Sequence, residues 1–180
     1  MKKLTKKMTS GIKEGDMGRR PNDEKVNLVS IRMVKEPPLY SERKIKSPDD
    51  VIGVIAEELK NYDRETFGIL NLKSNGQAIN FNICSMGTLD SSAVSPREVF
   101  KSCILSNAAA FIAIHNHPSG NLNPSQEDRD VTSRLLGCSE LLGIKMLDHI
   151  IIGGNTGAMY SFKSEGELER LRPISEVWNK

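Results

Sequence analysis

The sequence is poor in cysteine and has no long run of apolar residues. Its three cysteines, Cys84, Cys103 and Cys138, are widely spaced and form no Cys-x-x-Cys pair, which is typical of free thiols in a reducing cytosol. No stretch approaches the roughly 18 apolar residues that a membrane helix needs. No apolar segment follows the amino-terminal lysines, so we expect no secretory signal. These absences predict a cytoplasmic protein that does not contact a membrane.

Positive and negative charges nearly balance over the chain but are unevenly distributed. Residues 1–25 hold eight Lys or Arg against four acidic residues, a net charge of +4, whereas the whole chain carries +2, so residues 26–180 carry −2. A hydrophobic content of 38% and a charged content of 27% are those of a globular protein. We therefore predict a basic mobile tail over residues 1–25 and a single domain over residues 26–180. Any nucleic-acid contact is expected to be weak and to involve the tail.

Two of the three histidines, His115 and His117, stand at the end of an apolar stretch, residues 110–117. This stretch predicts a buried strand, in which residues i and i+2 point to the same face. After seven further residues Ser125 begins a predicted helix, and Asp128 shares one face of that helix with the apolar positions that follow. A buried carboxylate needs a partner, and a cation held by two histidines would be one. Two His and one carboxylate, with a fourth position left for water, are typical of catalytic zinc.

Each of these residues also has a purely structural interpretation. A lone His-x-His is most often a pair of ordinary histidines. Ser125 and Asp128 have the spacing of a capping box, which accounts for both residues without any metal chemistry.

The complete pattern, however, resembles a known family. His-x-His, seven residues, Ser, two residues and Asp is similar to the signature of the JAMM (JAB1/MPN+) zinc metallopeptidases. The surrounding sequence resembles the bacterial RadC-type branch of that superfamily. The similar segments are His115-Asn-His-Pro-Ser-Gly120, Gly87-Thr-Leu-Asp-Ser91, Ser95-Pro-Arg-Glu-Val99 and Leu147-Asp-His-Ile150. The resemblance covers roughly residues 45–165.

The resemblance implies a zinc ion held by His115, His117 and Asp128, and hydrolysis of a peptide or isopeptide bond in a peptide or protein substrate. Zinc would lower the pKa of a bound water to around 7. Ser125 matches the serine of the motif and is the candidate donor to an oxyanion.

Glu65 is the candidate general base. Its sequence, Glu-Thr-Phe-Gly, resembles the Glu-x-x-Gly context of the base in JAMM peptidases. The same glutamate also fits an ordinary charged loop, Asp63-Arg-Glu65, and Glu57, Glu58 and Asp63 are nearby alternatives.

Periodicity and turn signals predict the secondary structure. Helices are expected over residues 47–61, 95–106, 125–136 and 165–171, and Ser47, Ser95 and Ser125 are the expected N-caps. Strands are expected over residues 26–34, 66–72, 77–84, 110–117, 146–153 and 158–162, with Asn75-Gly76 in a hairpin turn. Ile79, Phe81 and Ile83 should share one face of their strand, and Ile104 should face inward from its helix.

Alternating helices and strands combined with two hairpins predict a mixed sheet with helices packed on its faces. This agrees with the fold that the resemblance implies. That fold is α/β (α+β), with three layers, α/β/α, around a mixed sheet, and it is the cytidine-deaminase-like JAB1/MPN fold.

Two other functions stay open at this point. RadC-type proteins have long been labelled as DNA-repair factors, so the chain could be a nucleic-acid-associated protein with a role in DNA repair or in a mobile element. Longer RadC-type chains carry an amino-terminal helix-hairpin-helix region, and no Gly-rich hairpin of that kind is visible in the tail. The chain could also be a binding module whose site no longer turns over. His149 is either a structural residue or one that contacts a zinc ligand or the substrate, and the oligomeric state is unknown from the sequence.

Overall fold

The computed structural model describes residues 45–59, 62–87, 94–154 and 158–171, all within one compact unit of the chain, Arg32–Lys180. The predicted tail over residues 1–25 and the predicted strand over residues 26–34 lie outside the described residues. All three cysteines are free thiols, as predicted. None of the helices in the described ranges combines the length and the apolar character needed to cross a membrane.

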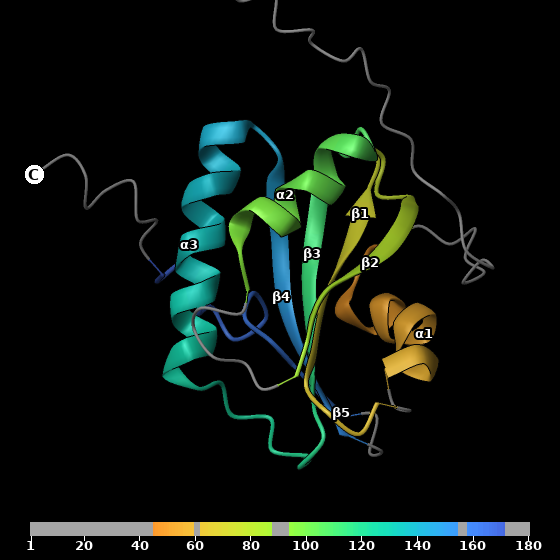
Figure 1. Ribbon diagram of the computed structural model, residues 1–180, viewed down its shortest axis with the longest axis vertical. Helices are drawn as coiled ribbons and strands as arrows, with labels where there is room; N and C mark the ends of the chain where they lie inside the picture. Colours follow the sequence, from red (N-terminus) through yellow and green to blue (C-terminus); the bar gives the residue numbers. More distant parts are fainter. Residues whose placement is uncertain (1–44, 60–61, 88–93, 155–157, 172–180) are drawn as a thin grey trace, which may run out of the picture. The chain divides into compact units, whose positions relative to one another are not determined.

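The described strands form one mixed sheet (Figure 1). In chain order the elements are α1 (Pro48–Leu59), β1 (Thr66–Leu72), β2 (Ala78–Met86), α2 (Pro96–Leu105), β3 (Ala110–His117), α3 (Gln126–Leu142), β4 (Lys145–Gly153) and β5 (Ala158–Ser161). The strand order is β2-β1-β3-β4-β5, and all neighbours are antiparallel except β3 and β4, which are parallel. A parallel pair needs a crossover connection, and α3 is that connection. The predicted mixed sheet is confirmed.

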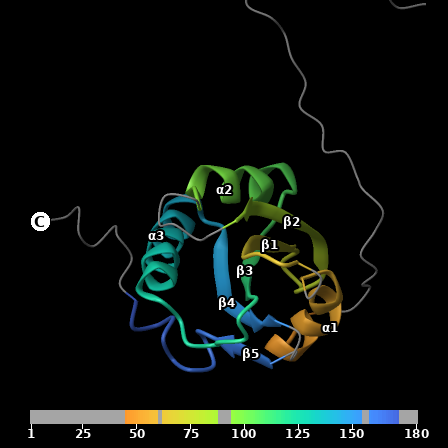
Figure 2. The same cartoon turned by 60° about the horizontal axis from the view of Figure 1, so that its bottom comes forward.

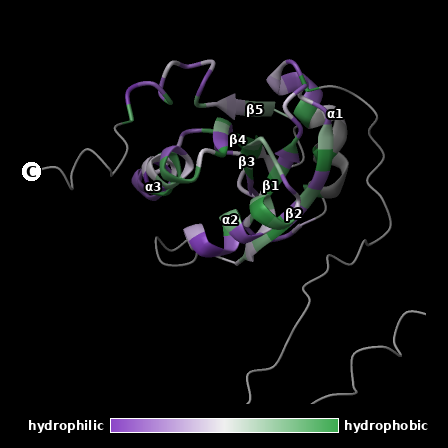
Figure 3. Cartoon of the chain, turned by 90° about the horizontal axis from the view of Figure 1, so that it is seen from above, coloured by the Kyte–Doolittle hydropathy of each residue, from purple (hydrophilic) through white to green (hydrophobic). Residues whose placement is uncertain are grey.

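Helices cover both faces of this sheet, which gives the three predicted layers. Figure 2 shows α1 on one side of the strands and α2 and α3 on the other. Strand β3 alternates between the two layers, because successive residues of a strand point to opposite faces. Phe111 and Ala113 pack in the core under α2 and α3, whereas Ile112 and Ile114 pack in the core under α1. Figure 3 shows hydrophilic and hydrophobic residues on every helix, as expected for helices that cover a sheet with one side only.

The helix starts follow the predicted N-caps, with one correction. Before α1, the backbone N–H and the hydroxyl of Ser47 both donate to Asp50 Oδ2, at 2.9 and 3.1 Å. Ser95 precedes α2 as predicted, but its side chain makes no capping hydrogen bond. The Ser-x-x-Glu spacing of residues 95–98 also suggests a capping box here, and this expectation is wrong: the Glu98 carboxylate pairs with Lys101 on the exposed side of the helix.

Two helical predictions differ from the structure in length or orientation. α3 continues six residues beyond the predicted end and stops at Gly143, which adopts the left-handed conformation with φ 67°. Glycine reaches this conformation without steric cost and so ends the helix. Ile104 is 58% exposed rather than inward-facing. It lies on the last turn of α2, where Ser102 and Cys103 form the buried side of the helix instead.

The predicted final helix over residues 165–171 is wrong. The segment forms successive turns, and Gly166 within it has φ 65°. The backbone N–H groups of Glu167 and Leu168 both donate to the carbonyl of Phe162, at 2.7 and 3.0 Å. A left-handed residue and converging hydrogen bonds of this kind prevent a regular helical ladder. The Glu167 carboxylate then accepts hydrogen bonds from Arg129 and Tyr160, at 2.8 and 3.0 Å, which fixes the turns against α3 and β5.

The predicted hairpin between β1 and β2 is present, but a bulge changes which residues share a face. Leu72 pairs with Ala78, and the preceding residue of β1 pairs with Asn80, so Ile79 is an extra residue in β2. An extra residue shifts the alternation of side chains by one position. Ile79 and Phe81 consequently pack in opposite cores, and the expectation that they share a face is wrong.

Candidate metal centre

The two histidines of the motif project from the end of β3 toward the layer that contains α3. Both are buried, with exposed fractions of 0% for His115 and 9% for His117. His115 is held from both sides, because it pairs with Phe67 of β1 and with Ile151 of β4, and His117 pairs with Gly153 of β4. Their i, i+2 spacing puts both imidazoles on one face. The two Nε2 atoms lie 2.9 Å apart.

Asp128 enters the same site from the first turn of α3. Its Oδ1 lies 3.2 Å from His115 Nε2, and its Oδ2 lies 3.8 Å from His117 Nε2. Oδ2 also accepts hydrogen bonds from the backbone N–H and the hydroxyl of Ser125, at 2.7 and 2.6 Å, while the Asp128 N–H donates to Ser125 Oγ. The predicted capping box is therefore present and orients the carboxylate toward the histidines. The structural and the metal-binding interpretations of Asp128 are compatible.

A chain of hydrogen bonds fixes the tautomer of His115. Thr132 Oγ1 donates its proton to the carbonyl of Asp128 at 2.6 Å. It must therefore accept a hydrogen bond from His149 Nδ1, which also lies 2.6 Å away, so Nδ1 of His149 carries the proton. His149 is fully buried, and burial is the main cause that lowers its pKa well below the ordinary value. A neutral His149 must accept at Nε2, which lies 2.8 Å from His115 Nδ1. His115 therefore donates from Nδ1 and, when neutral, presents an electron pair at Nε2.

The tautomer of His117 is fixed by the loop that follows it. His117 Nδ1 lies 2.5 Å from the backbone carbonyl oxygen of Asn121. A carbonyl only accepts, so Nδ1 of His117 carries the proton and its Nε2 presents an electron pair in the neutral ring. An outward hydrogen bond from the non-binding nitrogen is the usual arrangement for a histidine that binds a metal.

The donor set fits a divalent metal ion. His115, His117 and Asp128 each offer one ligand atom, and these atoms all lie within 4.8 Å of one another. Zinc–nitrogen bonds of about 2.0–2.1 Å at tetrahedral angles put the ligand atoms about 3.3 Å apart. The three separations of 2.9, 3.2 and 3.8 Å are grouped around that value. Three electron-pair donors facing one another in a buried site form a group that can hold a cation between them.

The charge state of Asp128 agrees with this role. Burial raises the pKa of the Asp128 carboxyl, but His115 and the two donors of Ser125 lower it by more, so the net pKa is below the ordinary value. The carboxylate is thus ionised at neutral pH, as a metal ligand must be.

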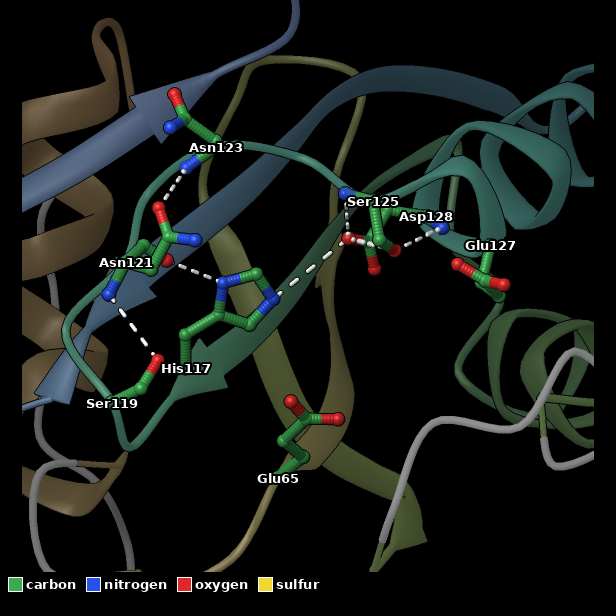
Figure 4. A pocket seen from close by; sticks show the side chains of 8 residues that line it. All are labelled: Glu65, His117, Ser119, Asn121, Asn123, Ser125, Glu127 and Asp128. Carbon is green, nitrogen blue, oxygen red and sulfur yellow. Dashed lines mark hydrogen bonds and ion pairs between the residues drawn. The ribbon is translucent and has the colours of Figure 1, made fainter.

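An open cleft of about 280 Å³ lies beside these ligands. Its wall is formed by polar side chains of the loop after β3 and the start of α3, together with one residue from the segment before β1. The lining residues are Glu65, His117, Ser119, Asn121, Asn123, Ser125, Glu127 and Asp128. Figure 4 shows the Glu65 carboxylate directed toward the part of the cleft where His117 lies. Of the acidic candidates for the base, Glu65 lines this cleft and Asp63 is not among its described lining residues, whereas the side chains of Glu57 and Glu58 lie outside the described residues.

Ser125 lines the cleft too, but its hydroxyl is engaged. Its oxygen accepts from the Asp128 N–H, and its proton is directed at Asp128 Oδ2, 2.6 Å away. Donation to an oxyanion would require the hydroxyl to turn away from Asp128. Ser125 as an oxyanion donor therefore stays a prediction, whereas its contact with the Asp128 carboxylate is direct.

Four residues of the site do not follow from the motif. Thr132 could have been suspected, because it lies one helical turn after Asp128 on the same face. His149 was open between a structural role and contact with a zinc ligand, and the structure places it against His115. Asn121 acts through its backbone carbonyl, for which no residue-specific signal exists. Asn116 is the variable residue of His-x-His, so the motif gives it no role, although its side chain bonds the backbone on both sides of Glu65.

Comparison with known proteins gives one family. A family model described as RadC-like JAB domain matches residues 45–167, which include Glu65, His115, His117 and Asp128. A UPF0758 protein of Desulforamulus reducens is 48% identical over 122 residues, covering 68% of this chain and 53% of that protein. UPF0758 proteins of Rubrobacter xylanophilus (44% over 124 residues, 69% and 53% covered) and Staphylococcus haemolyticus (48% over 110 residues, 61% and 48% covered) are also similar. The chain spans about half the length of these curated relatives.

Proposed function

The chain belongs to the RadC-like JAB domain family, and on that basis we propose that it is a zinc-dependent hydrolase that cleaves a peptide or isopeptide bond. The observation that carries the proposal is the convergence of three ligand atoms, from His115, His117 and Asp128, beside a cleft that Glu65 also lines. The JAMM metallopeptidases, which the motif resembles, suggest the reaction class.

In this proposal His115, His117 and Asp128 hold the zinc ion. Bound zinc supplies Lewis-acid chemistry, which lowers the pKa of water to about 7 and polarises a carbonyl group. Glu65 takes the proton from the attacking water and passes it to the leaving amine. The hydrogen bonds of His149 and Asn121 keep the two imidazoles in the tautomer that binds metal.

The charges of the cleft favour an amide over a phosphodiester as substrate. Three carboxylates line it, those of Glu65, Glu127 and Asp128, and no Lys or Arg is among its described lining residues. Phosphate groups are usually recognised by Lys, Arg and backbone N–H groups. A neutral acyl group would meet less electrostatic repulsion here than a phosphate. The cleft thus supports the hydrolase proposal more than the nucleic-acid alternative.

The first test is the metal itself. Protein purified without chelators should contain one zinc per chain by elemental analysis. His117→Ala removes one ligand and should lose the metal. A wild-type protein that binds no metal at micromolar zinc would overturn the proposal at its first step.

The second test is a proteome-scale cleavage comparison between the wild-type protein and Glu65→Gln. Wild type should generate new peptide ends, or release isopeptide-linked proteins, that the variant does not. Asp130→Asn is a matched control, because Asp130 is an exposed carboxylate of α3 outside the cleft lining, and it should cleave like wild type. A zinc-loaded wild type whose products equal those of Glu65→Gln would favour the non-catalytic binding module instead.

A further inference from the structure

Asn116 lies between the two histidines of the motif, and the proposed chemistry gives it no role. By the alternation of a strand, its side chain leaves β3 on the face opposite to His115 and His117. It is only 2% exposed. A buried amide has two donors and an acceptor to satisfy, so its partners show what it does.

The Asn116 side chain bonds the backbone on both sides of Glu65. Its Oδ1 accepts from the N–H of Thr66 at 2.8 Å, and its Nδ2 donates to the carbonyl of Arg64 at 3.1 Å. These two backbone groups flank Glu65, so the amide spans this one residue in the way that a neighbouring strand would. The carbonyl of Glu65 itself accepts from the N–H of Gly87 at 2.8 Å. Hydrogen bonds thus hold the backbone around Glu65, and two of them come from the single side chain of Asn116.

We propose that Asn116 is a positioning residue that holds Glu65 at the distance from the metal ligands that catalysis needs. The inference rests on the proposed function, because it assumes that Glu65 is the base. Asn116 lies between the two histidines in β3, so the same strand positions two of the proposed ligands directly and the proposed base through the Asn116 side chain. Glu65 precedes β1, where the strand ladder with β3 has not yet begun, since the first pair is Phe67 with His115. The Asn116 side chain thus takes the place of backbone pairing between β1 and β3 at the residues on either side of Glu65.

An asparagine meets this need because the site requires a donor and an acceptor on one short neutral group. An aspartate at this position would be the wrong chemistry, since a carboxylate accepts from Thr66 N–H but faces the Arg64 carbonyl with no proton to donate. Asn116→Asp therefore releases one side of Glu65, and Asn116→Ala releases both. Each variant removes a defined subset of the two hydrogen bonds, so the inference can be tested without a known substrate.

The first experiment uses the full chain loaded with zinc. Hydrogen exchange should be about tenfold faster at the Thr66 N–H in Asn116→Ala, because one hydrogen bond is lost, and close to wild type in Asn116→Asp. Zinc addition should shift the side-chain carboxyl ¹³C resonance of Glu65, identified by its disappearance in Glu65→Gln. This shift should shrink in both Asn116 variants while zinc content stays the same. Asn80→Ala is the matched control, since it removes a partly buried amide that bonds Asn71 and Ser106 away from the site.

The second experiment is a double-mutant cycle on any substrate that the cleavage comparison yields. Asn116→Ala should lower kcat by up to about a hundredfold, the cost of a misplaced catalytic group, with little change in KM. In the Glu65→Gln background the same substitution should have no further effect, because the group that it positions is already gone. Additive losses, or a zinc-induced Glu65 shift as large in Asn116→Ala as in wild type, would overturn the inference. If the wild type shows that shift but cleaves nothing, the proposed function fails and the positioning role stands.

Discussion

Replacing Thr132 by valine should weaken metal binding although Thr132 touches no metal ligand side chain. Valine keeps the shape of threonine but removes the hydroxyl, which lies between the Asp128 carbonyl and His149 Nδ1. Nδ1–H of His149 then has no acceptor in a fully buried position. The ring can recover by moving its proton to Nε2, but Nε2 faces His115 Nδ1. His115 must in turn move its proton to its own Nε2, which blocks the electron pair that a metal needs.

The size of the effect of Thr132→Val depends on whether the protons of His149 and His115 move to the other ring nitrogens. Loss of an outer hydrogen-bond partner of a metal-binding histidine typically costs 10–100-fold in metal affinity, or about 1.4–2.7 kcal/mol. If the proton does not move, an unsatisfied buried N–H costs about 1–3 kcal/mol of folding stability. We expect Thr132→Val to raise the zinc Kd by about 10–100-fold, to lower the free energy of unfolding of the metal-free protein, or both.

Competition with a chromophoric chelator measures the zinc Kd, denaturant unfolding of metal-free protein measures stability, and imidazole ¹⁵N spectra report the tautomers. Ser139→Ala is the matched control. Ser139 is a buried hydroxyl of the same helix that donates to a backbone carbonyl, that of Leu136 at 2.9 Å, far along α3 from Asp128. The reasoning is refuted if Thr132→Val binds zinc as wild type does and has unchanged stability and tautomers, or if Ser139→Ala weakens zinc binding equally.

Three further outcomes are expected. Glu65→Gln should lower turnover by about 10²–10⁴-fold, the usual contribution of general-base catalysis, with unchanged zinc content and Tm. Asp128→Asn should instead lose zinc together with activity. Equal zinc loss in both variants would make Glu65 a ligand. Removal of residues 1–25 should leave zinc content and Tm unchanged. A large fall in Tm would contradict this prediction, and a fall in DNA affinity alone would support the nucleic-acid alternative. Burial raises the pKa of the Cys84 thiol to about 11, so iodoacetamide should modify Cys84 slowly at neutral pH and about tenfold faster per pH unit as the thiolate forms. Cys103, whose pKa burial raises to about 12 and whose side chain has no exposed surface, should stay unmodified in the folded protein. Rapid modification of either of these two residues at neutral pH would contradict this.

The three candidate metal ligands were predictable from the sequence because the position of each depends on a local rule. The spacing of His115 and His117 needs only a strand, and the position of Asp128 needs only a helix start. The contact between His149 and His115 depends instead on β4 lying beside β3, and sequence periodicity does not determine which strands are neighbours. Thr132 is in the same situation, since its partner comes from another element.

The errors in the fold have the same physical origin. The extra residue Ile79 changes the facing of a strand through its pairing with β1, which the strand's own alternation cannot reveal. The segment over residues 165–171 has helix-forming residues, but its backbone bonds converge on Phe162 instead. Ser95 has the sequence of an N-cap, but its side chain makes no capping hydrogen bond and Glu98 pairs with Lys101. In each case a contact that the residue pattern does not specify decides the structure, although only the pairing of β2 with β1 joins different elements.

The hydrogen bonds that arrange His115, His117 and Asp128 have an entropic consequence. The loop between the second histidine and α3, residues 118–125, is anchored at its start by the bond from His117 to Asn121 and at its end by the capping box. Ordering such a chain segment costs about 1–2 kcal/mol per residue, and here folding itself bears that cost. A metal ion therefore does not have to organise its own ligands, in contrast to small zinc domains that unfold without metal. Metal binding at this candidate site should therefore carry little ordering cost, and a chelator should remove any bound metal while leaving the sheet and its helices folded.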